Sequence, residues 1–277
     1  MGADCHMHMI LDGYQWKNAI ARHSEKPDEA FIRQILSHYQ ELGYTYLRDG
    51  GDRWGAGKRA RELAGEYGIT YRTPLSPLHK VGHYGGFIGT GWETLSEYAG
   101  LVVKQREAGA DFIKIMISGL MDFDHYGVLT EEGLTEQEIR LLIHIAHQEG
   151  MAVMAHANGA RTVEAAAEAG VDSVEHGAYL DSSALQAMEA NGTVWVPTLS
   201  TVGNLRGKGR FPEDAVKRIL DSALANVAAY KGLLAPGTDA GAWAVPHGST
   251  TEAGFFAMAG VDENRLREGI AVIRSKF

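Results

Sequence analysis

Two histidines lie two residues apart in the stretch "DCHMH", close to the start of the chain. On a β-strand, side chains two apart point to the same face, so His6 and His8 are directed together. Two imidazoles that face a protein interior without partners are costly to bury, whereas one metal ion satisfies both. The motif therefore predicts half of a metal site.

The other half can come from ionisable residues at the ends of later apolar runs. His156 lies near the end of the run "MAVMAHA", His176 ends "VEH", and Asp239 lies in "GTDAG". Nitrogen and oxygen ligands without thiolates suit zinc or a similar divalent ion and leave a position open for catalysis. Zn, Mn, Fe, Co and Ni all accept such ligands, so the metal stays open. Taken singly, each histidine is compatible with a hydrogen-bonded core residue, and Asp239 with a turn residue.

Lys114 is the sixth residue of interest, because it lies inside the apolar run "FIKIMI". A lysine on an exposed edge strand would simply be solvated. A lysine buried among apolar residues must instead be neutral, paired or modified. The order of all six residues along the chain carries more weight than any one of them.

Short apolar runs that alternate with helical patterns must position these residues. The strands expected from the sequence are 3–7, 44–51, 69–73, 110–118, 151–157, 172–177, 193–198 and 233–241. The helices expected are 31–43, 55–68, 95–109, 134–150, 160–170, 182–192, 212–232 and a final stretch. The clearest helix begins with the capping box formed by Thr135 and Glu138.

About eight strand–helix units in about 250 residues fit a (β/α)8 TIM barrel of the α/β class, in one domain spanning residues 1–277. A doubly wound open sheet would call for a glycine-rich phosphate loop after the first strand, and none follows "DCHMH". In a barrel, the carboxyl ends of the strands converge on the face that carries active sites. That is where the candidate ligands fall.

The composition of the chain limits the kinds of partner that we expect. A net charge of −9 argues against nucleic acid or an anionic membrane as the main partner. A single cysteine, Cys5, suits a reducing cytoplasm. No signal peptide is visible, and no apolar run approaches the roughly 18 residues of a membrane span. We therefore expect a cytoplasmic protein that acts on a small molecule.

The order of the candidate ligands resembles the amidohydrolase superfamily, which has H-x-H on strand one, Lys on strand four, His on five, His on six and Asp on eight. The resemblance is strongest to the branch with imidazolonepropionase-related hydrolases and metal-dependent dipeptidases that cleave Xaa-Pro or Xaa-Lys/Arg. Local phrases agree as well, among them "GADFIKIMISG", "AHANGARTVEAAAEAGVDSVEHG" and "APGTDAGA". The match runs from Asp4 to about Gly260.

The resemblance implies a binuclear centre, with zinc as the expected metal. His6, His8 and Asp239 would bind the more buried ion. Lys114, carboxylated by CO2, would bridge both ions, and the second ion would be completed by His156 and His176. A hydroxide between the metals would attack an amide, peptide, cyclic amide or lactone. Asp239 would move its proton to the leaving group.

Substrate contacts are expected in the segments that follow strands. His83 in "HKVGHYGG" and Tyr179 in "EHGAYL" are the residues proposed here, and a loop residue without such a role is the alternative for each. The same kind of segment also contains Tyr14, His79, Tyr84, Tyr126, Trp195, Asn204, Trp243 and His247.

One departure from the family and two other functions stay open. Family members usually add a β-sandwich from flanking residues, and only five residues precede His6 here. A barrel without the sandwich would expose apolar surface or cover it in a homo-oligomer. A mononuclear deaminase is one alternative function, but the presence of Lys114 argues against it, because mononuclear family members lack a bridging lysine. A non-catalytic metal-binding barrel is the other, against which Asp239 speaks.

Overall fold

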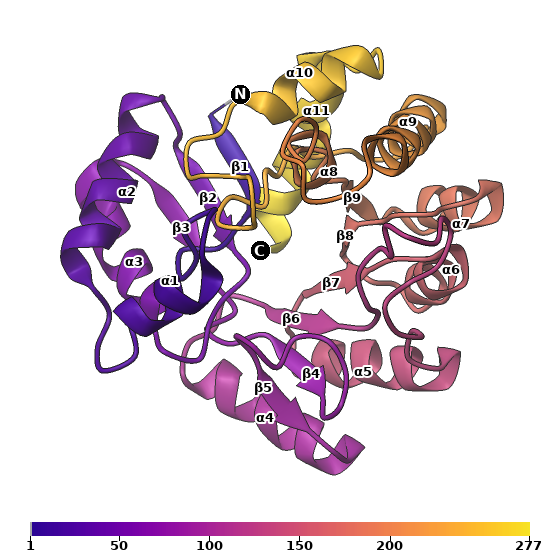
Figure 1. The fold of residues 1–277 in the computed structure, drawn as a ribbon. Coiled ribbons are helices and arrows are strands. Elements are labelled where there is room, and N and C mark those ends of the chain that lie inside the picture. The colour runs from indigo at the N-terminus through magenta and orange to yellow at the C-terminus, as the bar shows by residue number, and fades with distance from the viewer. Residues whose placement is uncertain (1) are drawn as a thin grey trace.

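Parallel strands form the interior of the protein, which we describe from a computed structural model for residues 2–277 (Figure 1). One sheet has the order β1-β2-β3, with β1 Ala3–Met7, β2 Tyr46–Asp49 and β3 Thr70–Arg72. The other has the order β5-β4-β6-β7-β8-β9, with β4 Leu78–Lys80, β5 Thr90–Trp92, β6 Ile113–Met116, β7 Val153–Ala157, β8 Ser173–His176 and β9 Val194–Val196. The predicted α/β class with parallel strands is confirmed.

Residues 234–240 lie between β9 and β1, where the eighth strand was predicted. Trp195 forms an isolated bridge with Leu234, and Met7 forms one with Ala240. Asp239 N donates to His6 O at 2.7 Å. Pro236 lacks an N–H and Asp239 has a φ of 56°, so this segment cannot run as a regular ladder. The prediction of a regular strand over 233–241 is therefore wrong in detail, although the segment has the predicted neighbours.

The two sheets do not join in one ladder within residues 2–277. β3 pairs with β2, whereas β4 pairs with β6. Pro74 and Pro77 lie between β3 and β4 and interrupt the hydrogen bonding there. The predicted third strand, 69–73, is found as β3 and ends before Pro74 as expected, but the closed ladder of an ideal barrel is not formed.

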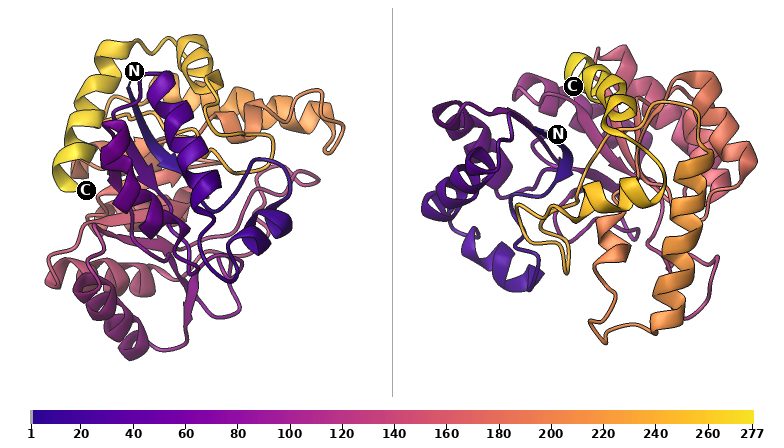
Figure 2. Two further views of the ribbon diagram at one scale, coloured as in Figure 1. Left: turned by 90° about the vertical axis from the view of Figure 1, so that its left-hand side faces the viewer. Right: turned by 90° about the horizontal axis from the view of Figure 1, so that it is seen from above.

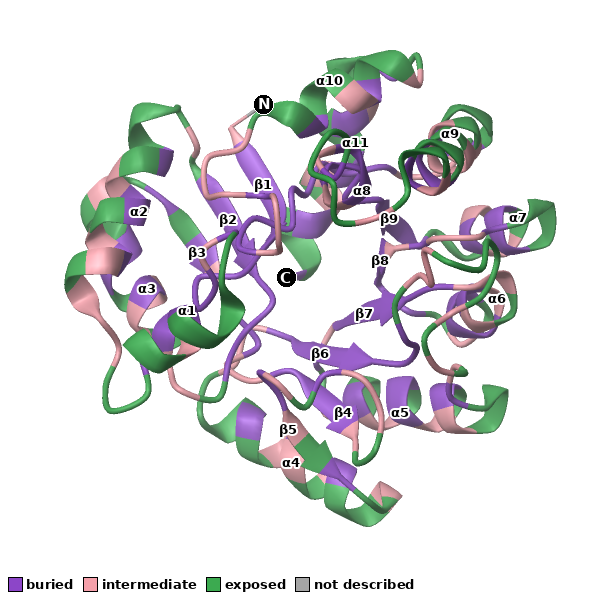
Figure 3. Cartoon of the chain, in the orientation of Figure 1, coloured by how far each residue is buried: buried purple, intermediate pink, exposed green. Residues whose placement is uncertain are grey.

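Helices cover the outside of the strands, with their exposed faces turned to solvent (Figure 3). Those predicted from the sequence are α2 Glu29–Glu41, α3 Ala56–Ala64, α4 Leu95–Glu107, α5 Glu136–Gln148, α6 Ala160–Glu168, α7 Ser182–Asn191 and α9 Glu213–Ala229. α5 has the predicted capping box and buries Ile139, Leu142, Ile143 and Ala146. Each of these helices in the described chain is too short or too polar to span a bilayer.

Several short elements were not predicted. They are β4, β5, α1 Trp16–Arg22 and α8 Ser200–Gly203, whereas the end of the predicted helix 55–68 is a 3-10 turn, Gly65–Tyr67. Three to seven residues are too few for a hydrophobic period to show. The final helical stretch is two helices, α10 Thr251–Met258 and α11 Glu263–Lys276, separated at Gly260 with a φ of 72°.

The N-terminal strand and the C-terminal segments lie side by side (Figure 2). α11 contacts β1 and β9, and it places Phe277 edge-on to Phe112 at 5.2 Å between ring centroids. An apolar cluster at this end of the strands contains Ala3, Cys5, Tyr46, Phe112, Met154, Val194, Val196, Ala235, Ile273 and Phe277. We call this cluster the apolar floor, because it lies beneath the polar interior.

Candidate metal centre

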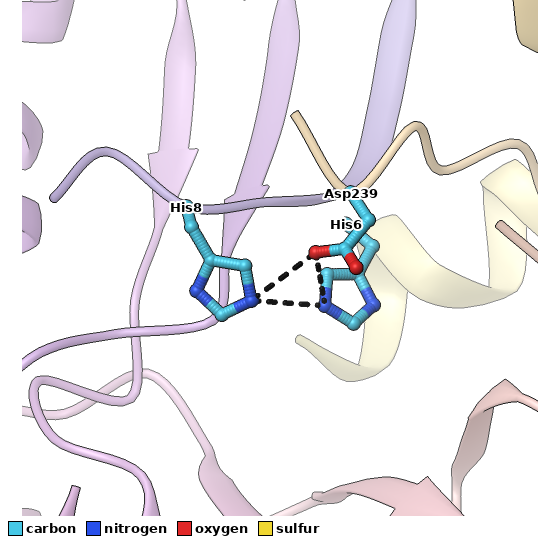
Figure 4. A group of neighbouring side chains, drawn as sticks. All are labelled: His6, His8 and Asp239. Atoms are coloured by element: carbon cyan, nitrogen blue, oxygen red, sulfur yellow. Dashed lines mark hydrogen bonds and ion pairs between the residues drawn. The ribbon is translucent and has the colours of Figure 1, made fainter. Parts of the chain in front are cut away.

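His6, His8 and Asp239 meet although 231 positions separate His8 from Asp239 in the numbering (239 − 8). Their side chains point toward one another (Figure 4). The Nε2 atoms of His6 and His8 are 3.4 Å apart. Asp239 Oδ1 lies 3.5 Å from His6 Nε2 and 3.3 Å from His8 Nε2. One ligand atom from each residue therefore lies within 4.8 Å of the other two, close enough to hold one ion.

A β-bulge in β1 aims His6 into the interior. Asp4 pairs with Leu47 and Met7 with Asp49, so three steps on β1 match two on β2. Cys5 packs in the apolar floor. In a regular strand, successive side chains point to opposite faces, so the side chain of His6 would point away from the face of Cys5. The extra residue re-aims the chain, so His6 also reaches the interior. The simple alternation used in the sequence analysis did not anticipate this bulge.

Two glycines make room for the histidine rings. A Cβ on Gly50 would lie 2.1 Å from His8 Cε1. A Cβ on Gly237 would lie 2.7 Å from His6 Cβ. Both glycines follow or form strand ends, in "RDGG" and "PGTD". Larger residues at either position would displace a ligand.

His156 and His176 lie next to this group. Their ring centroids are 4.6 Å apart, and that of His176 is 5.0 Å from that of His6. His156 Nε2 lies 3.3 Å from Gly119 O, and His176 Nδ1 lies 2.7 Å from Thr198 Oγ1. In each ring, these contacts use one nitrogen. The other nitrogen, Nδ1 of His156 and Nε2 of His176, could bind an ion.

Burial keeps these imidazoles neutral, which is the form that binds metals. It lowers the pKa of His156 to about 3 and the pKa of His176 well below its ordinary value. Lys114 adds to the effect on both. The same burial lowers the pKa of Lys114 to about 8, while Glu175 and Asp239 partly oppose it. Lys114 is only 1% exposed, and the lowered pKa increases the fraction of neutral amine near neutral pH, which is the form that reacts with CO2.

Backbone strain is concentrated at the same strand ends. His176, Thr198 and Asp239 have φ values of 68°, 47° and 56°, in the left-handed region that residues other than glycine seldom adopt. Such strain persists where the surroundings fix it, and it gathers at functional sites.

The two proposed substrate residues lie in loops after strands. His83 Nδ1 is 3.7 Å from Glu131 Oε1. Tyr179 OH donates to Asp122 O at 3.3 Å. Nothing here tests a substrate role, so both stay predictions. Tyr84 is closer to the site, with its ring centroid 4.7 Å from that of His156.

The sequence analysis missed a buried charged network beneath His6. It consists of Arg48 on β2 with Ser173 and Glu175 on β8. The only signal was an arginine and a glutamate inside otherwise apolar strand segments, "YLRD" and "SVEH".

Comparisons with known proteins place these features in a wider group. No protein-family model matches the chain. The chain is 25% identical over 273 aligned residues to the ochratoxinase of Aspergillus niger, covering 84% of this chain and 55% of that protein. An uncharacterised protein of Mycobacterium tuberculosis is 31% identical over 123 residues, 41% of this chain and 33% of that protein. The chain thus spans about half the length of the curated relatives it matches first.

Solved structures agree over nearly the whole chain. A Xaa-Pro dipeptidase with bound methionine superposes with a TM-score of 0.77 at 23% identity, covering 99% of this chain and 75% of that one. The structure of the A. niger ochratoxinase superposes with a TM-score of 0.76 at 21% identity, covering 99% of this chain and 69% of that one. The structure of an amidohydrolase superposes with a TM-score of 0.68 at 20% identity, covering 93% of this chain and 68% of that one.

The chain has the fold of the amidohydrolases. The resemblance inferred from the order of the ligands is therefore confirmed at the level of the fold. In that fold, the group formed by His6, His8 and Asp239 is the candidate metal centre.

Proposed function

We propose that this protein is a metal-dependent hydrolase that cleaves an amide, peptide, cyclic amide or lactone bond in a small molecule. The observation that carries the proposal is the meeting of His6, His8 and Asp239 in one buried group. Two atoms of this group, His8 Nδ1 and Asp239 Oδ1, are buried without a hydrogen-bond partner. An unpaired buried carboxylate oxygen is costly, and a cation beside it would offset that cost. The residues therefore fit a metal ion.

The finer proposal is a binuclear centre with zinc as the expected metal, inside a (β/α)8 barrel. His6, His8 and Asp239 would hold one ion, His156 and His176 the other, and carboxylated Lys114 would bridge both. Bound divalent ions would lower the pKa of water and polarise the scissile carbonyl. Burial of Lys114 and its lowered pKa of about 8 support this role.

Asp239 is the residue proposed to move the proton. One carboxylate oxygen, Oδ1, faces the two histidines, and the side chain keeps slight exposure at 11%. A carboxylate in that place can accept the proton of the attacking water and return it to the leaving nitrogen. The left-handed backbone at Asp239 fixes the direction of this side chain.

An aromatic row supports an apolar substrate. Trp16 packs edge-on to Phe87 at 5.8 Å between centroids, and Phe87 lies 5.7 Å from Tyr84, whose ring contacts that of His156. Trp16 is 49% exposed, so the row runs from solvent to a candidate ligand. We propose a peptide-like, cyclic amide or lactone substrate with an apolar group beside the scissile bond. The peptide bond is the one cleaved by the Xaa-Pro dipeptidase that shares this fold.

The first experiment measures metal per chain and turnover together. Protein purified with bicarbonate and without chelator is analysed for elements, then assayed on dipeptides with apolar or charged first residues, N-acyl amino acids and lactones. About two divalent ions per chain with turnover of apolar substrates supports the binuclear hydrolase. About one ion per chain, without turnover of these substrates, supports the mononuclear deaminase instead. About two ions without turnover support a non-catalytic barrel.

Asp239→Asn is expected to abolish turnover while the fold is retained, because asparagine tolerates the left-handed backbone but cannot accept the proton. Turnover is measured with the best substrate, and circular dichroism checks the fold. Asp221→Asn on exposed α9 serves as the matched control and is expected to leave turnover unchanged. Near-normal turnover in Asp239→Asn would show that another group moves the proton.

A further inference from the structure

Glu175 on β8 contacts His6 on β1 through the protein interior. Its Oε2 lies 2.7 Å from His6 Nδ1, the ring nitrogen that faces away from the group formed with His8 and Asp239. Both side chains are 0% exposed. The contact joins residues 169 positions apart, so the fold alone creates it.

Arg48 holds Glu175 in place. Arg48 Nη2 donates to Glu175 Oε1 at 2.8 Å, and Ser173 Oγ donates to the same oxygen at 2.6 Å. A buried carboxylate is costly unless it is paired, and here the pair is complete. Glu175 thus keeps one oxygen for Arg48 and Ser173 and the other for His6.

Arg48 is itself fixed on several sides. Its Nε donates to Cys5 O at 2.7 Å and its Nη1 to Ser173 Oγ at 2.9 Å. The guanidinium carbon lies 4.5 Å from the ring centroid of Phe277, in the range of a cation–π contact. The side chain is 0% exposed and has little freedom to move. The network therefore connects the apolar floor of the strands to one candidate metal ligand.

We propose that Glu175, held by Arg48, is a positioning residue that fixes the orientation and tautomer of His6 for metal binding. The inference rests on the proposed function, because it requires that His6 binds a metal. A carboxylate paired with arginine only accepts hydrogen bonds, so His6 Nδ1 carries the hydrogen and Nε2 keeps its lone pair. Partners of this kind orient ligating histidines, and their loss typically lowers metal affinity about 10–100-fold.

His8 provides an internal contrast. Its Nδ1 is buried and has no hydrogen-bond partner, and its ring is confined by Gly50. The two histidines of one motif are thus held by different means: His6 by a charged network and His8 by close packing. A change at Glu175 therefore acts on His6 and leaves the packing around His8 in place.

Glu175→Gln tests the proposal with metal affinity as the readout. An amide can offer its oxygen to His6 or to Arg48 but not to both, and its NH2 then faces the other donor. Metal-free protein is titrated with Zn²⁺ against a fluorescent chelator, and the affinity of the variant is expected to fall about 10–100-fold. Glu252→Gln is the matched control, since Glu252 is equally a buried glutamate but bonds Leu199 N and Ser200 N. Its affinity is expected to stay at the wild-type value.

Further outcomes keep the inference separate from the proposed function. Wild-type protein that binds no Zn²⁺ contradicts the proposed function itself. Wild-type protein that binds Zn²⁺, with Glu175→Gln binding equally well, overturns only the positioning role. Where Glu175→Gln does not fold, Glu175→Asp keeps the charge for Arg48 and draws the carboxylate away from His6, and the same loss is expected. Histidine ¹⁵N NMR of the metal-free wild type gives a direct check: an Nε2–H tautomer at His6 overturns the proposal.

Discussion

At the scale of single residues, the candidate metal centre depends on small residues as much as on its ligands. Gly50 leaves the space that the ring of His8 fills, and Gly237 leaves space for the Cβ of His6. Neither has a side chain that could bind anything. Their role is visible only because the structure shows which ring lies against each of them.

Gly50→Ala is expected to weaken metal binding. The added Cβ would lie 2.1 Å from His8 Cε1, so the ring must leave its present position, in which Nε2 lies 3.3 Å from Asp239 Oδ1. Metal affinity by chelator competition measures the effect. Gly100→Ala in α4 is the matched control, because a Cβ there meets nothing within 4 Å and alanine favours helix by about 0.5–1 kcal/mol. Equal metal affinity in both variants would contradict the close packing around His8.

Lys114→Ala is expected to remove the second metal and reduce turnover, because the proposed bridge is lost. A short-chain carboxylic acid added to the variant should restore part of the activity by supplying a carboxylate in the vacated space. Metal per chain and turnover with and without the acid are the measurements. Lys104→Ala on exposed α4 controls for loss of a lysine. Unchanged metal content in Lys114→Ala rules out the bridge.

At the scale of elements, long periodic segments follow the sequence closely. The strand over residues 3–7 has the predicted bounds, and α5 has both its predicted capping box and its predicted buried stripe. The bulge in β1 is different, because only pairing with β2 defines it. Periodicity is a property of one segment, whereas a bulge is a property of two.

Thr135→Ala is expected to lower the free energy of unfolding by about 1 kcal/mol, because Thr135 Oγ1 no longer accepts from Glu138 N. Metal binding should be unchanged, since α5 covers the outside of the strands. Urea unfolding monitored by circular dichroism measures the change. Gln137→Ala in the same turn is the control and is expected to have little effect. A similar loss of stability in both variants would contradict the capping role.

At the scale of the whole molecule, the two ends of the chain are joined by polar contacts outside the metal centre. Thr238 Oγ1 donates to Asp4 Oδ2 at 2.6 Å. Asp4 and Glu252 line a cavity of about 170 Å³, and burial raises the pKa of Asp4 to about 6 and that of Glu252 to about 8. The folded protein therefore retains a proton on Glu252 that the unfolded chain, with an ordinary pKa of 4.5, releases.

Stability is expected to fall as the pH rises from 6.5 to 8. In this window the unfolded chain has lost the proton of Glu252 while the folded chain still holds it, so each rise in pH favours unfolding. The buried histidines with lowered pKa values oppose this below pH 6.5, and Lys114, whose pKa is lowered to about 8, opposes it increasingly as the pH approaches 8. Urea unfolding of metal-free protein measures the slope, and Glu252→Gln should flatten it. An equal slope in both proteins would show that Glu252 does not hold the proton.

The sequence by itself determined the alternation of strands and helices, the α/β class and the order of the candidate ligands. These follow from local patterns: an apolar run, a capping box, a glycine stop, a motif such as H-x-H. These patterns could be recognised in the sequence because each lies entirely within one short segment.

Only the tertiary structure decided how these parts meet. It separated the strands into two sheets between β3 and β4, reduced the eighth strand to isolated bridges, and placed Glu175 and Arg48 beneath His6. The physical reason is distance along the chain: a contact between His6 and Glu175 leaves no periodic trace in either segment. The sequence therefore named the candidate ligands, and packing across the interior decided which residues hold them in place.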